Sequence, residues 1–185
     1  MILFINACVR GESRTKLLAS ALLEKLNEPY EEVRLEDIDF PKVDEAFLHK
    51  RDGLIAAEEF SAPIFAPARQ FARADKIVIA APYWDLSFPA ALKQYFEQIN
   101  VLGITFRYTE EGFPEGLCRA KELYYVSTAG GSFVPEEFGF GYVKALAEGF
   151  YGIKNSRLFI AKGLDIVGAD AEAIVEECIR EICAL

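Results

Sequence analysis

The stretch that most constrains the fold of this chain is Lys76–Pro89, KIVIAAPYWDLSFP. Its uncharged segment Ile77–Pro82 predicts a strand buried on both faces of a sheet. The strand must stop at Pro82, because proline has no N–H to donate to a neighbouring strand. Tyr83 and Trp84 follow at once, so large aromatic rings are expected at the carboxyl end of a buried strand, where they need something to cover them.

A helix is predicted directly after this aromatic loop. Pro89 opens an amphipathic run, Ala90–Asn100, and proline is tolerated in the first turn of a helix. The unit is therefore strand, aromatic loop and helix. In open parallel α/β sheets, ligands bind at junctions of this kind.

The remainder of the chain alternates in the same way. Further strands are predicted at Met1–Cys8, Tyr30–Leu35, Lys121–Thr128 and Ser156–Ala161. Further helices are predicted at Ser13–Leu26, twice within Pro41–Gln70, at Phe138–Tyr151 and at Ala169–Ala184. Because parallel strands need helical crossovers, this pattern predicts a doubly wound, five-stranded parallel sheet of order 2-1-3-4-5. The segment from about residue 103 to 117 is expected to be an excursion from this sheet.

Length and charge limit the classes of function. A chain of 185 residues with 52% hydrophobic residues fits one α/β domain. The net charge of −9 has the wrong sign for nucleic acid, and no apolar run is long enough to span a membrane. The four cysteines form no CxxC pair, so free thiols in a reducing compartment are expected. We therefore expect a soluble, cytoplasmic protein with neither nucleic acid nor membrane as partner.

The loop after the first predicted strand has the composition of a phosphate site. Arg10, Ser13, Arg14 and Thr15 lie where a helix begins, so guanidinium groups and hydroxyls meet free backbone N–H groups. The alternative is that Ser13 is only an N-cap and that both arginines are solvated. The spacing of a Walker loop is absent.

The loop after the fourth predicted strand contains two glycines. It comprises Ser127, Thr128, Ala129, Gly130 and Gly131. Paired glycines let a backbone approach a ligand closely, although a plain turn is the alternative. In the predicted strand order this loop flanks the other two. One loop offers phosphate donors, one offers aromatic faces and one offers close backbone approach, which together suit a phosphorylated planar heterocycle.

Two longer motifs resemble a known family. The run Pro82–Lys93, PYWDLSFPAALK, is similar to the P-x-Y-N-F-x-x-P-x-x-L-K loop and helix of the flavodoxin-like FMN-dependent NAD(P)H oxidoreductases, the azoreductase and quinone reductase group. The run Gly103–Thr109, GITFRYT, matches a second motif of this family, and Gly112–Leu117 matches its G-P-E-G-L with an inserted phenylalanine.

The resemblance implies a flavodoxin-like fold and a two-electron hydride transfer through FMN. NADH or NADPH would be the donor, and a quinone, azo or nitro compound the small-molecule acceptor. No protein acid or base is required for these steps, so no catalytic residue is assigned. The residues assigned to the cofactor are Arg10, Ser13, Arg14 and Thr15 at the phosphate, Pro82, Tyr83, Trp84, Asp85 and Leu86 at the ring, and Ser127, Thr128, Ala129, Gly130 and Gly131 at its pyrimidine edge.

The chain also departs from the family pattern. Asp85 stands where the family usually has asparagine, and a carboxylate near the ring disfavours an anionic reduced flavin. Tyr83 and Trp84 replace methionine and tyrosine, and Thr128 stands where many members have arginine. Cys8–Arg10 replaces the serine, proline and arginine of the first loop.

Two other functions remain open at this stage. One is an electron carrier of the flavodoxin kind, which binds FMN without acting on small molecules, although its T-x-T-G-x-T loop is missing. The other is a receiver or interaction domain without a cofactor. Receivers need clustered acidic residues after the first strand, where this chain has Asn6, Ala7 and Cys8.

A homodimer is expected from the apolar character of the excursion. Ile104–Tyr108 has strand composition, although a crossover at this point needs no additional strand. Further exposed apolar area is expected from Phe113 and Pro114 beyond it and from Tyr95, Phe96 and Ile99 before it. The alternative is that the excursion folds back over its own helix. The resemblance implies that the two active sites lie at the dimer interface.

Overall fold

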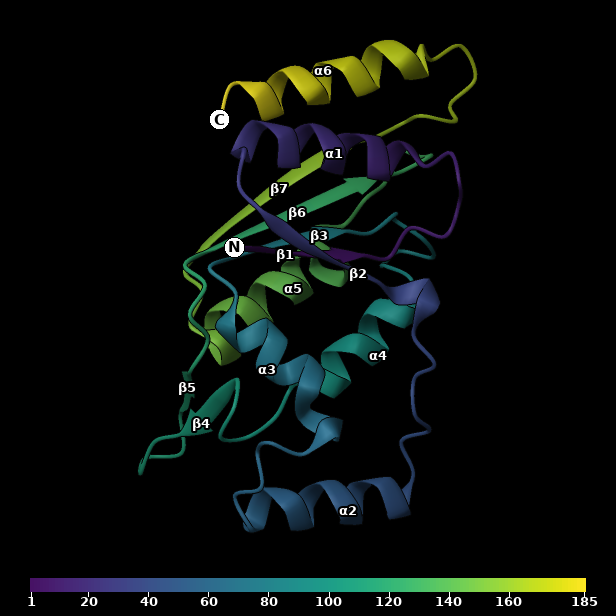
Figure 1. Ribbon diagram of the computed structural model, residues 1–185. Coiled ribbons are helices and arrows are strands. Elements are labelled where there is room, and N and C mark those ends of the chain that lie inside the picture. The colour runs from purple at the N-terminus through teal and green to yellow at the C-terminus, as the bar shows by residue number, and fades with distance from the viewer.

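The computed structural model describes residues 1–185, and its centre is a parallel sheet of five strands (Figure 1). The strands are β1 (Ile2–Asn6), β2 (Tyr30–Arg34), β3 (Lys76–Ala80), β6 (Glu122–Thr128) and β7 (Asn155–Ala161). They lie in the order β2-β1-β3-β6-β7, and every neighbouring pair is parallel. Numbered within this sheet alone, the order is 2-1-3-4-5, as the alternation of strands and helices predicts.

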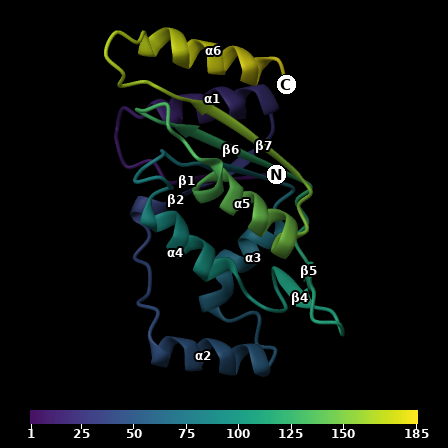
Figure 2. The same cartoon turned by 180° about the vertical axis from the view of Figure 1, so that it is seen from behind.

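Helices cover both faces of the sheet (Figures 1 and 2). They are α1 (Arg14–Leu26), α2 (Glu45–Ala56), α3 (Ala66–Arg73), α4 (Ala90–Ile99), α5 (Phe140–Leu146) and α6 (Ala171–Cys183). α1 and α6 lie on one face and α3, α4 and α5 on the other, while α2 lies beyond α3 and α4 and buries no residue fully. No helix combines the length and apolar character needed to cross a bilayer.

Burial of the strands follows their composition. All five residues of β1 are buried, because apolar side chains on alternate sides of the strand pack into the two helical layers. Phe4 faces Leu18 and the α1–α6 layer, whereas Ile5 belongs to the cluster on the α3–α5 side. β2, with sequence YEEVR, lies at the edge of the sheet and alternates exposed and half-buried residues.

Short helical turns and two boundaries differ from the sequence-based expectation. Turns of 3-10 helix occupy Leu35–Asp37, Pro63–Phe65 and Glu136–Phe138. The predicted helix Phe138–Tyr151 is instead α5 followed by a π-helical turn, Ala147–Tyr151. Pro89 is the residue that precedes α4 and does not lie in its first turn.

The segment expected to leave the sheet forms a small hairpin. β4 (Phe106–Tyr108) and β5 (Pro114–Gly116) pair antiparallel outside the main sheet. The expectation that Tyr95, Phe96 and Ile99 are exposed is wrong, because this face of α4 is buried in the core beneath the sheet. α4 packs against α3 and the sheet, so its apolar stripe is covered within a single chain.

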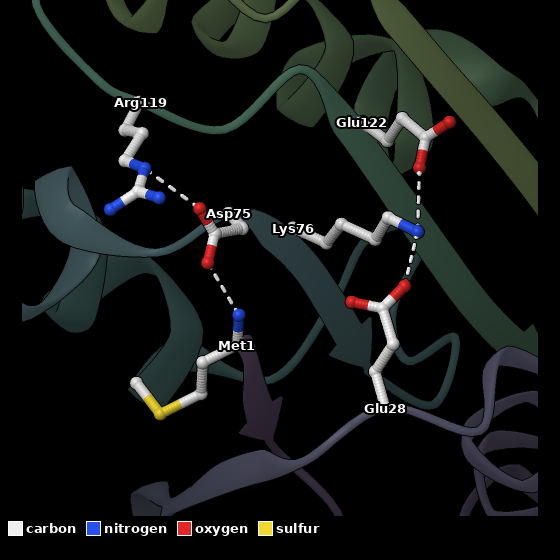
Figure 3. A network of polar contacts seen from close by, with 6 residues as sticks. All are labelled: Met1, Glu28, Asp75, Lys76, Arg119 and Glu122. Atoms are coloured by element: carbon white, nitrogen blue, oxygen red, sulfur yellow. Dashed lines mark hydrogen bonds and ion pairs between the residues drawn. The ribbon is translucent and has the colours of Figure 1, made fainter.

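Charged residues gather at the amino ends of the strands (Figure 3). The Asp75 carboxylate accepts a hydrogen bond from the amino group of Met1 and forms an ion pair with Arg119, whose Nε lies 2.7 Å from Oδ1. The amino group of Met1 and, to a lesser extent, Arg119 hold the pKa of Asp75 below its ordinary value. The contacts join the starts of β1 and β3 to the segment that leads into β6.

A second charged group lies beside the first (Figure 3). The Lys76 ammonium is 2.5 Å from Glu28 Oε1 and 3.3 Å from Glu122 Oε2, so it joins the start of β3 to the α1–β2 connection and to the start of β6. The Glu28 hydrogen bond is the main cause of a raised Lys76 pKa. Ion pairs thus lie at the amino ends of the strands, and the loops with ligand-binding character lie at the carboxyl ends.

Candidate functional site

A cleft of about 780 Å³ opens at the carboxyl ends of the strands, where β1, β3 and β6 meet. The predicted site residues that line it are Arg10, Ser13, Arg14, Thr15, Pro82, Tyr83, Trp84, Thr128, Ala129 and Gly130. The structure therefore brings the three predicted loops together. Asp85, Leu86, Ser127 and Gly131 do not line this cleft. The lining residues that sequence reasoning missed are Cys8, Val9, Gly11, Glu12, Lys16, Leu17, Ser20, Leu164 and Asp165.

The first wall of the cleft is the start of α1. Ser13 is the N-cap of this helix, and its Oγ accepts a hydrogen bond from the Lys16 N–H at 3.2 Å. The cap satisfies one N–H only, so the N–H groups of Arg14 and Thr15 have no partner within the helix. These N–H groups and the helix dipole favour an anion at this position. Capping by Ser13 and binding of a phosphate are therefore compatible.

A pair of hydroxyls joins this helix start to the central sheet. Thr15 is buried, and its Oγ1 lies 2.6 Å from Oγ1 of Thr128 at the end of β6. One hydroxyl of such a pair donates to the other, which leaves the second hydrogen free for a ligand. The pair holds the first and third predicted loops side by side.

The aromatic loop contains a tight turn that sequence reasoning did not anticipate. Trp84 and Ser87 exchange two backbone hydrogen bonds of 2.9 and 2.8 Å. Asp85 and Leu86 between them have φ values of 49° and 68°, as in a type I′ turn. The turn directs both residues into a second groove of about 520 Å³, lined also by residues of α4 and α5. Asp85 is thus placed beside the cleft and not within it.

Tyr83 lies in the cleft and anchors another loop. Its N–H donates to the Thr128 carbonyl at 3.0 Å, and its hydroxyl donates to the Pro135 carbonyl at 3.3 Å. Burial raises the pKa of Tyr83, so the phenol stays neutral. Ser87 Oγ donates to the Phe138 carbonyl at 2.5 Å. These two bonds therefore hold the loop between β6 and α5 against the aromatic turn. Phe133 in the same loop is 76% exposed.

The glycine loop, residues 127–131, supplies another wall of the cleft beside the helix start. Ser127 is buried, and its Oγ donates to the Ala81 carbonyl at 2.7 Å, so this hydroxyl joins β3 to β6 and does not reach the cleft. A Cβ on Gly130 would lie 2.3 Å from Asp165 Oδ2. The Asp165 side chain already occupies this space, so the absence of a side chain on Gly130 lets the two loops pack together.

A fourth wall comes from the loop after β7. The N–H groups of Gly163, Leu164 and Asp165 donate to carbonyls of the glycine loop at 3.0, 3.2 and 2.9 Å. Asp165 Oδ1 also accepts from Arg14 Nη1 at 3.3 Å, so this loop links the glycine loop to the start of α1. The sequence did contain a signal for this wall. The loop follows the fifth parallel strand, so it lies at the same carboxyl ends of the strands as the other three loops.

Cys8 lies at the base of the cleft beside the end of β1. Its N–H donates to Asn6 Oδ1 at 2.9 Å, and Asn6 Nδ2 donates in turn to Glu32 at 2.8 Å. Burial raises the pKa of the Cys8 thiol, which therefore stays protonated. The thiol is a small buried wall residue and not an activated nucleophile.

Comparison with known proteins agrees with this geometry. A family model described as a flavodoxin-like fold matches residues 1–185. An FMN-dependent NADH:quinone oxidoreductase of Clostridium perfringens is 39% identical over 195 residues, covering 100% of this chain and 96% of that protein. One from Clostridium beijerinckii is 39% identical over 183 residues, covering 94% and 90%.

Solved structures show the same fold. An azoreductase from Bacillus anthracis strain Sterne has a TM-score of 0.85 at 26% identity, covering 99% of this chain and 96% of that one. An FMN-dependent NADH-azoreductase of Bacillus anthracis strain Ames Ancestor, solved with FMN, has a TM-score of 0.79 at 23% identity, covering 99% and 95%. The family resemblance seen in the motifs is confirmed: the chain belongs to the flavodoxin-like family that includes the FMN-dependent NADH:quinone oxidoreductases.

Proposed function

We propose that this protein is an FMN-dependent NAD(P)H oxidoreductase that reduces quinone, azo or nitro-type acceptors. The observation that carries the proposal is the meeting of a helix start, an aromatic loop and a glycine loop in one cleft at the switch point of the sheet. The names of the relatives support the same activity. The protein is a single-domain, cytoplasmic enzyme in this proposal, and its four cysteines are free thiols.

The residues of the cleft fit FMN. The volume of about 780 Å³ lies within the range of cofactor sites. The start of α1, with Arg10 and Arg14, would hold the phosphate, and Tyr83 and Trp84 would lie at the ring. Gly130 lines the cleft without a side chain, so the cofactor would meet its backbone directly. When bound, FMN supplies the redox chemistry, accepting hydride from the nicotinamide and passing two electrons to the acceptor.

The protein groups of the cleft bind, orient and exclude water. The pKa values of Tyr83 and Cys8 are both raised by burial, so neither group is ionised near neutral pH. Neither is therefore suited to act as a general base. The loop between β6 and α5 is fixed to Tyr83 and to the aromatic turn through the Pro135 and Phe138 carbonyls. We assign no catalytic residue.

The electron-carrier alternative is separated from the enzyme by reduction with nicotinamide. We expect anaerobic mixing of the holoprotein with NADH or NADPH to bleach the bound flavin, and addition of a quinone to restore its colour. A flavin that neither nucleotide reduces would contradict the reductase. A colourless protein that takes up no flavin would favour the domain without a cofactor.

Trp84 reports directly on the position of the flavin. It is the only tryptophan in the chain, and it lines the cleft with its side chain partly exposed. We expect its fluorescence to be strongly quenched when FMN binds to the apoprotein, because the ring would lie against or beside the flavin. The control is Trp84→Phe, which should bind FMN without this signal. Equal emission from apo and holo protein would place the ring away from the cofactor.

We also propose a homodimer formed through the β4–β5 hairpin. Tyr108 and Phe113 are 53% and 69% exposed, and Leu102 and Leu117 on the adjoining segments are also exposed. Apolar side chains gathered in this way favour an interface, and two-fold dimers are the commonest closed assemblies. In this dimer each active site lies at the interface.

Sedimentation at micromolar concentration tests the dimer. We expect twice the mass of the 20.7 kDa chain, and the single-chain mass for a variant that combines Tyr108→Glu with Phe113→Ser. Leu48→Ser on α2, also an exposed apolar residue, is the control and should leave the mass unchanged. A fully active wild-type protein with the mass of one chain would show that the interface is unnecessary.

A further inference from the structure

The cleft carries an ion pair at the position where a phosphate is expected. Arg14, the first residue of α1, lies 3.3 Å from Asp165 on the loop after β7. The other charged residues that line the cleft are Arg10, Glu12 and Lys16. Three cations and two carboxylates leave a net charge of only +1, so the cleft is much less cationic than its arginines suggest.

The position of the Asp165 carboxylate is determined by the fold. The backbone of this loop is bonded to the glycine loop by three N–H groups, including that of Asp165 at 2.9 Å. Oδ2 lies in the space that a side chain on Gly130 would occupy. Gly163, the second residue after β7, has φ 78°, a conformation that glycine adopts readily. The carboxylate is therefore held over Gly130 and facing Arg14, although its side chain is 75% exposed.

A phosphate must compete with this carboxylate for Arg14. Exposed ion pairs of this type contribute about 0.2–1 kcal/mol, so a phosphomonoester dianion can replace Asp165 on the guanidinium. Asp165 then remains close to the bound phosphate and repels it. An unphosphorylated flavin escapes both effects, because it places no charge at the helix start.

We propose that Asp165 is a positioning residue that acts through Arg14 and limits how strongly the cleft prefers phosphorylated over unphosphorylated flavin. The inference rests on the proposed function, since it takes FMN as the ligand. In the free cleft Asp165 is paired with Arg14, so a phosphate gains this guanidinium only by displacing the carboxylate. The cofactor is therefore bound more weakly, and exchanges more readily, than it would in the same cleft without the Asp165 carboxylate.

The test is a titration of the apoprotein with FMN and with riboflavin, followed by flavin fluorescence. Asp165→Asn, which keeps the shape of the side chain, should bind FMN about fivefold more tightly at low salt and riboflavin unchanged. Asp165→Glu keeps the charge and should bind FMN with nearly wild-type affinity. Asp52→Asn, which removes the carboxylate of the exposed Arg51–Asp52 pair on α2, is the charge-matched control and should change neither affinity.

The role of Arg14 is measured by a double-mutant cycle. In an Arg14→Ala background the gain from Asp165→Asn should fall to about twofold, because only direct repulsion of the phosphate remains. Unchanged or weaker FMN binding by Asp165→Asn, or an equal gain for riboflavin, overturns the inference and leaves the proposed function intact. A wild-type protein that binds neither flavin overturns both.

Discussion

Arg10→Ala is expected to weaken FMN binding about tenfold to a hundredfold, because loss of a charge-assisted hydrogen bond to phosphate costs about 1.5–3 kcal/mol. Arg10 lines the cleft, is exposed and makes no ion pair within the chain. Its guanidinium is therefore available to a phosphate and more exposed than Lys16, whereas Arg14 is already paired with Asp165. No ion pair or side-chain hydrogen bond within the protein is lost, so the fold should be unaffected.

The measurement is a titration of the apoprotein with FMN, together with thermal unfolding without ligand. Arg157→Ala is the matched control, since it removes the same charge from the first half of β7, away from the cleft at the carboxyl ends of the strands. This control should leave FMN affinity unchanged. FMN affinity that is also unchanged in Arg10→Ala would remove Arg10 from the phosphate site.

Gly116→Ala is expected to destabilise the protein by about 3 kcal/mol or more, because the added methyl group has no space. A Cβ at this position would lie 2.1 Å from Gly152 N and 2.2 Å from the carbonyl carbon of Tyr151. Both atoms belong to backbone, so no side chain can rotate away. Gly152 itself has φ 74°, and a Cβ there would meet Gly116 at 3.3 Å. The two glycines allow β5 to pack directly on the π-helical turn that follows α5.

Urea unfolding measures this effect. Gly53→Ala in α2 is the matched control, since a Cβ there has no atom within 4 Å, and alanine favours a helix over glycine by about 1 kcal/mol. The control should be neutral or slightly stabilising. A Gly116→Ala protein as stable as the wild type would mean that the hairpin moves away from the turn without loss. In that case its sedimentation would show whether the dimer survives.

Local composition was sufficient to predict the sheet and the meeting of three loops. Uncharged runs such as Ile77–Pro82 can be stable only when both faces are covered, and helical crossovers between them require parallel pairing. Once the strands are in this order, the ends of β1, β3 and β6 are adjacent whatever their side chains. Arg10, Tyr83 and Gly130 were therefore assigned to one cleft from their positions along the chain.

The direction of individual side chains depended on tertiary structure. Asp85 and Leu86 leave the cleft because two residues adopt left-handed backbone, which neither residue type requires. Ser127 is bonded to Ala81, 46 residues away, and so does not reach the ligand side. Asp165 meets Arg14, 151 residues away, through a loop with no recognisable motif.

The same reason explains the error at α4. Composition shows that Tyr95, Phe96 and Ile99 form an apolar stripe, but only packing decides whether the stripe meets its own sheet or a second copy of the chain. Repeating patterns report which faces must be buried, since they reflect helix and strand geometry within one segment. The partner of each face, and the hydrogen bonds that orient the polar groups of the cleft, arise from contacts between distant segments and were decided by the tertiary structure.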